Sequence, residues 1–273
     1  MTDRLYYEDS HLTEFPAVVT ACEQEKDSWR ISLDQTAFFP EGGGQSGDTG
    51  YLGDVEVFDT HEKNGEIWHY TRQPLEIGAE VKGVLDWKKR FSRMQQHSGE
   101  HIVSGLIHTR FGYDNVGFHL GEEEVTMDFN GPISREELAE IEAAANQVVF
   151  DNVPILISYP CKEELAILDY RSKIEIEGQV RIVTIPDTDV CACCAPHVER
   201  TGEIGLIKLT NVQSHRGGVR VNLLAGDRAL RDYREKETSV KAVSVLLSAK
   251  EAVVADAVER LKQENFRLTG QLM

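Results

Sequence analysis

The pattern of apolar and polar positions changes along the chain, and its first part consists of short strand-like runs. Runs such as AVVTA, WRISL, VEVFDT, EIWHY and EVKGVLD are separated by turn residues at short, fairly even spacing. Several short strands in close succession are typical of a small barrel. We therefore predict a β-barrel domain over residues 1–88. The loop TAFFPEGGGQSGDTG is its most distinctive connection, because three consecutive glycines allow a tight turn or the close approach of a ligand.

The middle of the chain mixes helical and strand patterns. In MQQHSGEHIVSGLIHTRFG, Ile102 and Leu106 fall on one apolar stripe, as in an amphipathic helix. A second helix is expected after Ser134, which forms a capping-box pattern with Glu137. The strand-like runs ILISY, VRIVTI, GLIKLTN and VRVNLL follow. We therefore predict an α+β domain with an antiparallel sheet over residues 89–226.

Residues 227–273 are predicted to form one long helix. Apolar residues recur there every seven positions, at Val240, Leu247, Val254, Leu261 and Leu268. This repeat is typical of a coiled coil, which would join two chains, although Ser244 and Glu251 interrupt the earlier heptads. A helix folded back onto the domain is the alternative. Because the pattern stops in mid-repeat, we expect this chain to be part of something longer.

Composition points to a globular protein of the cytoplasm. No apolar run approaches membrane-spanning length, and the first residues, MTDRLYYEDSHLTEFP, lack a signal-peptide pattern. Three of the five cysteines lie within four residues of one another, which is too crowded for an ordinary disulfide framework. In a reducing compartment such a cluster is more often a set of metal ligands or reactive thiols.

The net charge restricts how this protein could bind nucleic acid. A formal charge of −17 argues against broad, non-specific binding, because phosphate is repelled by such a surface. A local basic footprint is still compatible with it. The segment WKKRFSR provides Lys88, Lys89, Arg90 and Arg93 just before a helical pattern. The alternative is an ordinary solvated turn.

Two motifs carry candidate metal ligands. His97 and His101 are four residues apart, so a helix places them on one face, where two imidazoles could bind one zinc ion. In VCACCAPHVERTG, Cys191 and Cys194 form C-x-x-C, whereas Cys193 and His197 form C-x-x-x-H. Only the second pairing joins both motifs in one site, but spacing alone does not decide between the cysteines.

The stretch HSGEH also matches H-x-x-E-H, the inverted zinc-peptidase motif. Glu100 would then be a general base, and a remote carboxylate would be the third ligand. This interpretation leaves CACCAPH without a role. We therefore expect Glu100 to point to solvent.

Four motifs together resemble the editing domain of alanyl-tRNA synthetases, and still more the free-standing alanyl-tRNA editing proteins of the AlaX type. They are TAFFPEGGGQSGDTG, RMQQHSGEHIVSGL, CCAPHVERTGEIG and GGVRV, in this order. The resemblance covers residues 1–226. It implies that Cys193 and His197 join His97 and His101 as zinc ligands, although this chain has Cys194, Ala195 and Pro196 where the family usually has glycines and a threonine.

The resemblance also implies a fold and an activity. The expected fold is an elongation-factor-like β-barrel, followed by the editing domain shared with threonyl-tRNA synthetases. The expected activity is hydrolysis, in trans and without ATP, of serine or glycine esterified to tRNA(Ala). Thr36 and Gln45 are then candidates for the substrate pocket, and Arg220 joins residues 88–93 as a candidate phosphate contact. Two other functions remain open, namely a tRNA-binding module with structural zinc and the zinc peptidase.

Overall fold

The computed structural model describes residues 2–172 and 178–272, which combine α-helices with antiparallel β-sheets. The predicted α+β class is thereby confirmed. The chain separates into two compact units, Met1–Asp227 and Arg228–Met273. The first unit contains the barrel, the sheets that follow it and every candidate site residue.

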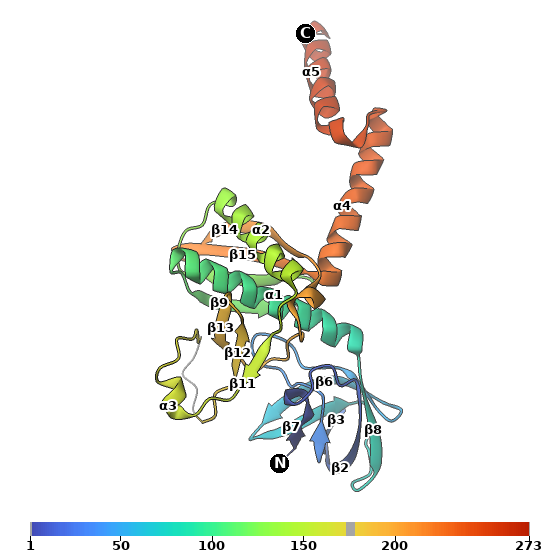
Figure 1. The fold of residues 1–273 in the computed structure, drawn as a ribbon. Helices are drawn as coiled ribbons and strands as arrows, with labels where there is room; N and C mark the ends of the chain where they lie inside the picture. The colour runs from blue at the N-terminus through green and yellow to red at the C-terminus, as the bar shows by residue number, and fades with distance from the viewer. Residues whose placement is uncertain (1, 173–177, 273) are drawn as a thin grey trace. The chain divides into compact units, whose positions relative to one another are not determined.

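Six strands of the first unit close into a barrel in the order β2-β3-β7-β6-β5-β8 (Figure 1). All their pairings are antiparallel. The strands are β2 (Glu14–Glu25), β3 (Ser28–Leu33), β5 (Gly50–Leu52), β6 (Val55–Lys63), β7 (Glu66–Thr71) and β8 (Glu80–Leu85). Inward-facing apolar side chains such as Phe15, Ile31, Leu33 and Leu52 fill the interior. A kinship of this barrel with elongation factors stays a prediction.

Short elements join the barrel to its own N-terminus. Strand β1 (Asp3–Arg4) pairs in parallel with β4 (Gln35–Thr36), and the 3-10 helix η1 (Leu5–Tyr7) follows β1. Tyr6 packs there against Phe39 and Ala195. The N-terminal segment therefore contacts both the barrel loop after β4 and the cysteine-rich segment.

A four-stranded antiparallel sheet in the order β14-β15-β10-β9 forms the body that follows the barrel. Its strands are β9 (Asn115–Leu120), β10 (Val125–Phe129), β14 (Ile207–His215) and β15 (Gly218–Ala225). A second sheet of three antiparallel strands contains β11 (Leu156–Ser158), β12 (Ile182–Ile185) and β13 (Asp189–Ala192). Two short helices, α3 (Lys162–Leu165) and η2 (Thr201–Ile204), lie in the connections.

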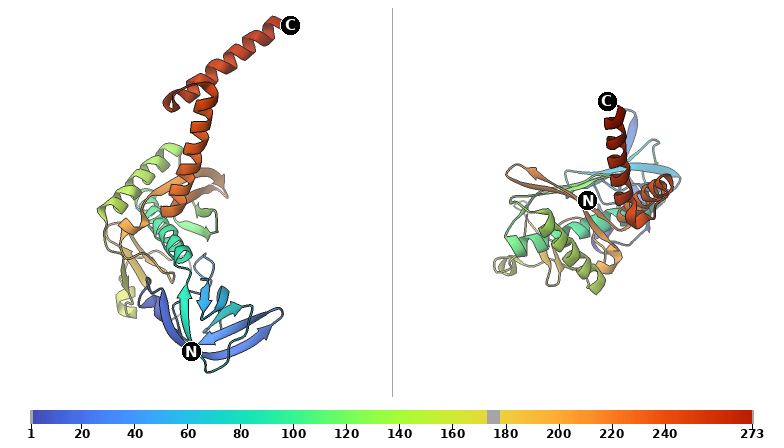
Figure 2. Two further views of the ribbon diagram at one scale, coloured as in Figure 1. Left: turned by 90° about the vertical axis from the view of Figure 1, so that its right-hand side faces the viewer. Right: turned by 90° about the horizontal axis from the view of Figure 1, so that it is seen from above.

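Helix α1 (Trp87–Phe111) begins directly after the barrel and packs against α2 (Arg135–Asp151), β9, β13 and β15 (Figures 1 and 2). The Asp86 side chain caps its first turn, and Gly112, at φ 70°, ends it. Helix α2 carries the predicted capping box, in which Ser134 and Glu137 each bond the other's backbone N–H. Because α1 lies between the two sheets, most of its polar side chains are buried as well as its apolar ones.

The second unit corrects the prediction of a single long helix. Helix α4 (Gly226–Leu247) enters this unit, and η3 (Glu251–Val253) and α5 (Val254–Leu272) follow within it. Ser248 adopts a left-handed conformation at φ 49°, and the Ser244 hydroxyl donates to the Ala249 carbonyl, so the helical ladder ends there. The interruption falls between Ser244 and Glu251, the two residues that break the heptad pattern. Among the described residues, no helix has both the length and the apolar character needed to cross a membrane.

Candidate metal centre

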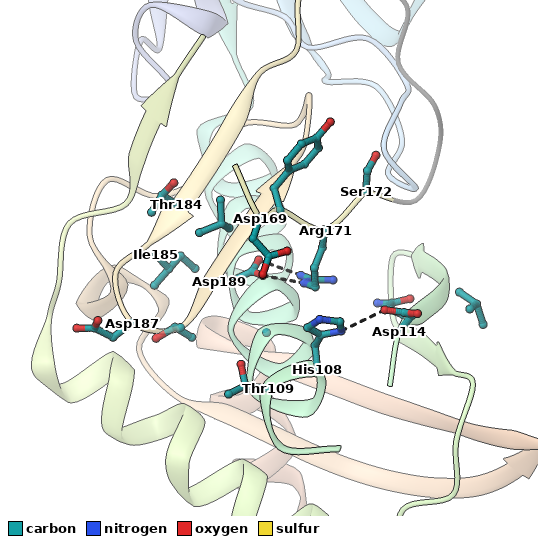
Figure 3. A pocket seen from close by; sticks show the side chains of 16 residues that line it. His108, Thr109, Asp114, Asp169, Arg171, Ser172, Thr184, Ile185, Asp187 and Asp189 are labelled. Atoms are coloured by element: carbon teal, nitrogen blue, oxygen red, sulfur yellow. Dashed lines mark hydrogen bonds and ion pairs between the residues drawn. The ribbon is translucent and has the colours of Figure 1, made fainter. Parts of the chain in front are cut away.

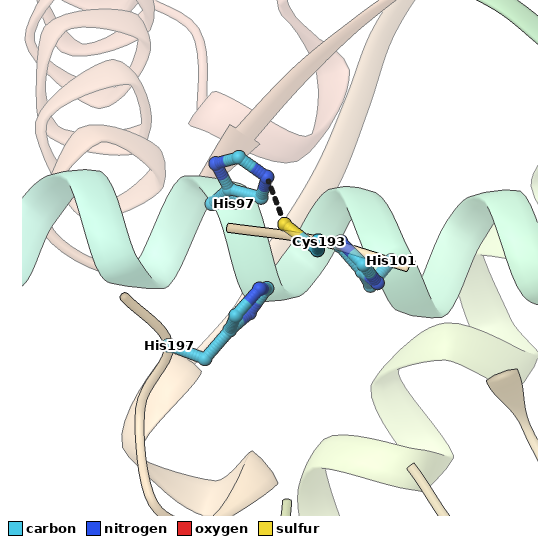
Figure 4. A group of neighbouring side chains, drawn as sticks. All are labelled: His97, His101, Cys193 and His197. Atoms are coloured by element: carbon cyan, nitrogen blue, oxygen red, sulfur yellow. Dashed lines mark hydrogen bonds between the residues drawn. The ribbon is translucent and has the colours of Figure 1, made fainter. Parts of the chain in front are cut away.

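Four side chains predicted to bind zinc lie together in the first unit. His97, His101, Cys193 and His197 each offer one ligand atom, and these four atoms lie within 4.8 Å of one another (Figure 4). The Cys193 Sγ is 3.4 Å from the His97 Nε2. The three histidines are at most 3% exposed, so the cluster is shielded from bulk water.

Local structure brings the four side chains to one point. His97 and His101 are one turn apart on α1, and Cys193 is the first residue after β13. The backbone of Cys193 donates to the Arg181 carbonyl, and the Arg181 guanidinium donates to the carbonyls of Cys193 and Ala195. This arrangement holds the segment after β13 against the end of β12, so that it leads His197 back towards α1.

Each histidine of the cluster is oriented by a hydrogen-bond partner at its Nδ1. The three pairs are His97 with Gln45 Oε1 at 3.0 Å, His101 with Asp189 Oδ2 at 2.9 Å, and His197 with Ser98 Oγ at 2.9 Å. An imidazole that donates from Nδ1 presents a lone pair at Nε2, which is the usual arrangement of a metal-binding histidine. The buried Nε2 of His197 has no hydrogen-bond partner among the described residues. A metal ion would satisfy that atom.

The electrostatic environment favours the metal-binding forms of Cys193 and His197. Burial alone would raise the pKa of the Cys193 thiol, but the neighbouring imidazoles of His97, His101 and His197 hold it well below its ordinary value. Burial and the charge of His101 lower the pKa of His197 to about 3. The pKa of His101 is instead raised above its ordinary value, because the sulfur atoms of Cys191 and Cys193 and the hydrogen bond to Asp189 outweigh the effect of burial. A thiolate with neutral imidazoles is a donor set that suits Zn²⁺. The residues present therefore fit the zinc ion that the sequence predicts.

The other two cysteines of the motif lie outside this cluster of four. Cys191 is buried on β13, beside His101 and Asp189, and burial raises the pKa of its thiol. Cys194 is exposed as a residue, but neighbouring atoms cover most of its thiol group, and this burial of the sulfur raises its pKa to about 11. The pKa of both thiols is thus raised, whereas that of the Cys193 thiol is lowered.

The prediction that Glu100 points to solvent is wrong. This carboxylate is 1% exposed, because α1 is covered on both sides. Its Oε1 accepts hydrogen bonds from Ser104 Oγ at 2.7 Å and Asn115 Nδ2 at 2.6 Å. Its Oε2 lies 3.8 Å from the His101 Nε2. The two histidines of HSGEH share their cluster with Cys193 and His197, whereas the remote carboxylate of Asp189 contacts His101 at Nδ1 and is not a member of that cluster of four.

Sequence reasoning missed Asp189, which connects the cluster to a neighbouring cavity. Its carboxylate accepts from the His101 imidazole and also from Arg171 Nε at 2.7 Å (Figure 3). Burial would raise the pKa of Asp189, but these two hydrogen bonds hold it below its ordinary value. The cavity has a volume of about 720 Å³ and is also lined by His108, whose Nδ1 lies 3.1 Å from an Asp114 oxygen. Strand alternation could have indicated Asp189, because residues 189 and 191 fall on the same face of an extended chain as the candidate ligand Cys193.

The two predicted pocket residues occupy different surroundings. Gln45 is 3% exposed and contacts the cluster through His97. Thr36 is fully buried on β4, where its hydroxyl lies 2.8 Å from the His69 Nε2 and accepts from the Phe38 backbone N–H. The Thr36 hydroxyl therefore already has two partners within the protein.

The four cations of the predicted basic footprint lie on two different sides of helix α1, one exposed and one buried. Lys88 and Lys89 are exposed, whereas Arg90 and Arg93 are at most 8% exposed. Arg90 forms a buried ion pair with Asp48, and Arg93 donates to the Gly47 carbonyl at 2.8 Å. This corrects the prediction for both arginines, because they join α1 to the barrel and present no free surface to a phosphate.

Arg220 is the remaining predicted phosphate contact, and it lies on β15 away from that footprint. Its guanidinium binds both oxygens of Asp128 on the adjacent strand β10, at 2.6 and 2.7 Å. The side chain is still one-third exposed. A phosphate could therefore reach Arg220 only in competition with the Asp128 carboxylate.

Comparison with known proteins shows which family the chain resembles. Residues 180–221 match the family described as Threonyl and Alanyl tRNA synthetase second additional domain, and residues 3–89 match tRNA synthetases class II (A). Alanyl-tRNA editing protein Aarsd1 of Danio rerio is 30% identical over 95% of this chain and 67% of its own length. The chain belongs to the family of alanyl-tRNA editing proteins.

Two further relatives show how the chain corresponds to longer proteins. Alanyl-tRNA editing protein AlaX-L of Pyrococcus horikoshii is 34% identical, and the match covers 86% of this chain and 61% of that protein. Alanine--tRNA ligase of Natronomonas pharaonis is 36% identical over 96% of this chain, which corresponds to 30% of the ligase. This chain thus spans roughly two-thirds of the editing proteins and less than a third of the ligase.

Proposed function

We propose that this protein hydrolyses the ester bond of tRNA(Ala) carrying a wrong amino acid, serine or glycine, at a zinc centre made by His97, His101, Cys193 and His197. The observation that supports it most is the convergence of a low-pKa thiol and three oriented imidazoles, one with an unpartnered buried Nε2. Membership of the alanyl-tRNA editing family supplies the substrate class. The reaction would proceed in trans, in the cytoplasm and without ATP.

The chain's own residues account for much of the proposed chemistry. An aminoacyl ester is already activated towards hydrolysis, so holding it beside a water molecule in a fixed orientation contributes a large part of the rate. Zinc bound at this centre would supply a fixed positive charge that polarises the ester carbonyl. Buried imidazoles, each anchored at Nδ1, keep the donor atoms in place and limit the entry of bulk water.

The barrel is proposed to contribute the recognition of the amino acid. We assign Thr36 and Gln45 to the border of the aminoacyl pocket, on a barrel of the elongation-factor type. A hydroxyl that hydrogen-bonds the serine side chain would be left unpaired by alanine, which favours cleavage of the mischarged substrate. For Thr36 this would require its hydroxyl to exchange its bond with His69 for one to the substrate.

The tRNA would contact the protein through few cations. The exposed Lys88 and Lys89, next to the N-terminus of α1, are the proposed phosphate contacts, with Arg220 as a weaker one because of its pairing with Asp128. The exposed apolar residues of α5, among them Val258, Leu261 and Leu268, support the proposal of a homodimer formed through this helix.

A tRNA-binding module with structural zinc is the second candidate. Four protein donors lie together here, and four protein donors would fill a tetrahedral zinc site, as is typical of structural rather than catalytic zinc. Such a module would bind tRNA without cleaving it, and would unfold when the metal is removed.

The deciding experiment is the hydrolysis of Ser-tRNA(Ala), with Ala-tRNA(Ala) as the control, by zinc-loaded and chelator-treated protein. Selective release of serine that stops on chelation supports the editing hydrolase. Cys193→Ala should abolish it while the fold is kept, whereas Cys191→Ala should have little effect. Tight tRNA binding without release of serine would favour the structural-zinc module instead.

A further inference from the structure

The glycine-rich barrel loop reaches the metal centre, and its conformation depends on two glycines. Gly42 and Gln45 exchange two backbone hydrogen bonds, at 3.1 and 3.2 Å, around Gly43 at φ 61° and Gly44 at φ 84°. Positive φ at both central positions defines a type I′ turn, which glycine adopts without strain. The turn therefore has one well-defined shape and presents Gln45 at its end.

The turn is docked against the body that carries the zinc ligands. The Leu120 backbone N–H of β9 donates to the Gly44 carbonyl at 2.8 Å. A Cβ at Gly44 would lie 2.8 Å from the Phe118 ring and 2.9 Å from the Phe118 carbonyl, so only glycine fits. A Cβ at Gly43 would lie 3.6 Å from His97 Cε1. The loop thus lies in contact with both β9 and a metal ligand.

Gln45 is the residue of this loop whose side chain forms a hydrogen bond with a proposed zinc ligand, His97. Its Oε1 accepts from the His97 Nδ1 at 3.0 Å, and the side chain is almost fully buried. This bond selects the tautomer whose Nε2 lone pair faces the Cys193 Sγ, 3.4 Å away. Without an acceptor at Nδ1, His97 could turn or carry its proton on Nε2, and either change would weaken metal binding.

We propose that Gln45 is a positioning residue of the metal centre, and that the barrel loop completes this centre by fixing His97. This role concerns the metal ligand itself and is separate from the substrate contact assigned to Gln45 above. It rests on the proposed zinc site but not on the proposed deacylation. Zinc should then bind more tightly when the loop is docked against β9, and bound zinc should in turn stabilise the docked loop.

The test is the zinc affinity of the full chain, measured by competition with a chromophoric chelator, for the wild type, Gln45→Leu and Gln45→Glu. Gln45→Leu removes the acceptor and should weaken zinc binding by roughly 10- to 100-fold, as is typical for partners of ligating histidines. Gln45→Glu keeps an acceptor oxygen and should restore most of the affinity. Gln35→Leu is the matched control, because the Gln35 side-chain amide donates to the Pro16 carbonyl within the barrel and, among the described residues, is not part of the four-residue cluster.

Hydrogen exchange supplies a second readout that needs no tRNA. Zinc should slow exchange at the Leu120 amide in the wild type, and less so in Gln45→Leu. The proposal is overturned if Gln45→Leu binds zinc as tightly as the wild type, or if Gln45→Glu loses as much affinity as Gln45→Leu. A substrate-contact role alone would instead raise the KM for Ser-tRNA(Ala) at unchanged zinc affinity. Absence of deacylation in every variant would contradict the proposed function and leave this result intact.

Discussion

A histidine in the barrel core gives the fold a dependence on pH. Burial lowers the pKa of His69 to about 4, against an ordinary value near 6.5. Its Nδ1 donates to the Ile31 carbonyl, and the Thr36 hydroxyl donates to its Nε2, so the neutral ring has both its partners. Protonation would turn the Nε2 acceptor into a donor that faces another donor.

We expect the free energy of unfolding to fall as the pH drops from about 6.5 to about 4. In this range the unfolded chain binds a proton at residue 69 that the folded barrel excludes, so the slope approaches about 1.4 kcal/mol per pH unit. Urea titrations between pH 4.5 and 7.5 would measure it, with His69→Gln as the comparison. The explanation fails if the wild type and this variant lose stability in parallel.

A carboxylate beside a metal ligand is expected to control zinc affinity. Asp189 accepts from His101 Nδ1 at 2.9 Å and is held ionised by Arg171. Asp189→Asn weakens the acceptor and should reduce zinc affinity by roughly 10- to 100-fold. Asp187→Asn, two residues earlier in the same hairpin, is the control and should bind zinc as the wild type does. Equal affinity in both variants would contradict this account.

At the scale of elements, the close packing of α1 on the β12–β13 hairpin positions Asp189. Gly105 permits this packing, because a Cβ there would lie 2.3 Å from the Thr188 carbonyl oxygen and 2.8 Å from the Asp189 Cβ. Gly99 lies six residues earlier on α1. A Cβ added there would have its nearest neighbour, the Ala225 Cβ, at 3.4 Å, which is an ordinary contact distance. The two glycines therefore offer a matched pair of substitutions on one helix.

Gly105→Ala should lower the free energy of unfolding by about 1–3 kcal/mol, because the backbone of the hairpin must move away from α1. Gly99→Ala should be neutral, or stabilising by up to about 1 kcal/mol, because alanine has the higher helix propensity. Denaturant unfolding of both variants measures the difference. Similar changes in the free energy of unfolding for the two variants would show that the hairpin tolerates a Cβ at position 105.

The sequence predicted elements well wherever local pattern determined them. The capping box at Ser134 and the antiparallel strands are confirmed, because caps and strand alternation depend on neighbouring residues. The break near Ser248 was missed, although it lies between the two residues that interrupt the heptads. A seven-residue spacing describes the face of a helix and does not show that the helix is continuous.

At the scale of the whole molecule, contacts between distant segments were beyond sequence reasoning. The basic segment around Arg90 suggests a surface cation, but its partner Asp48 lies 42 residues earlier, on the barrel. Glu100 was expected in solvent because nothing local indicates that α1 is covered by both sheets. The resemblance supplied the long-range pairing of Cys193 and His197 with the two helical histidines, which spacing alone had left open, and the structure brings these four side chains together. Asp189, which belongs to no such motif, was missed.

The overall charge leads to a last prediction about tRNA binding. With a formal charge of −17, binding of phosphates must rely on local groups of cations, and Lys88 and Lys89 are exposed on the first turn of α1. Replacing both with glutamine should weaken binding of tRNA(Ala). It should also reduce the slope of log K against log salt concentration by about 1 for each phosphate that the protein no longer neutralises.

A filter-binding titration at several salt concentrations tests this expectation. Lys82→Gln is the control, since Lys82 already pairs with Glu14 at 2.6 Å on the barrel surface and should leave the slope unchanged. An unchanged slope in the Lys88→Gln, Lys89→Gln double variant would mean that the tRNA lies elsewhere. Arg220 would then be the cation to replace next, because breaking its pair with Asp128 for a phosphate exchanges one anionic partner for another.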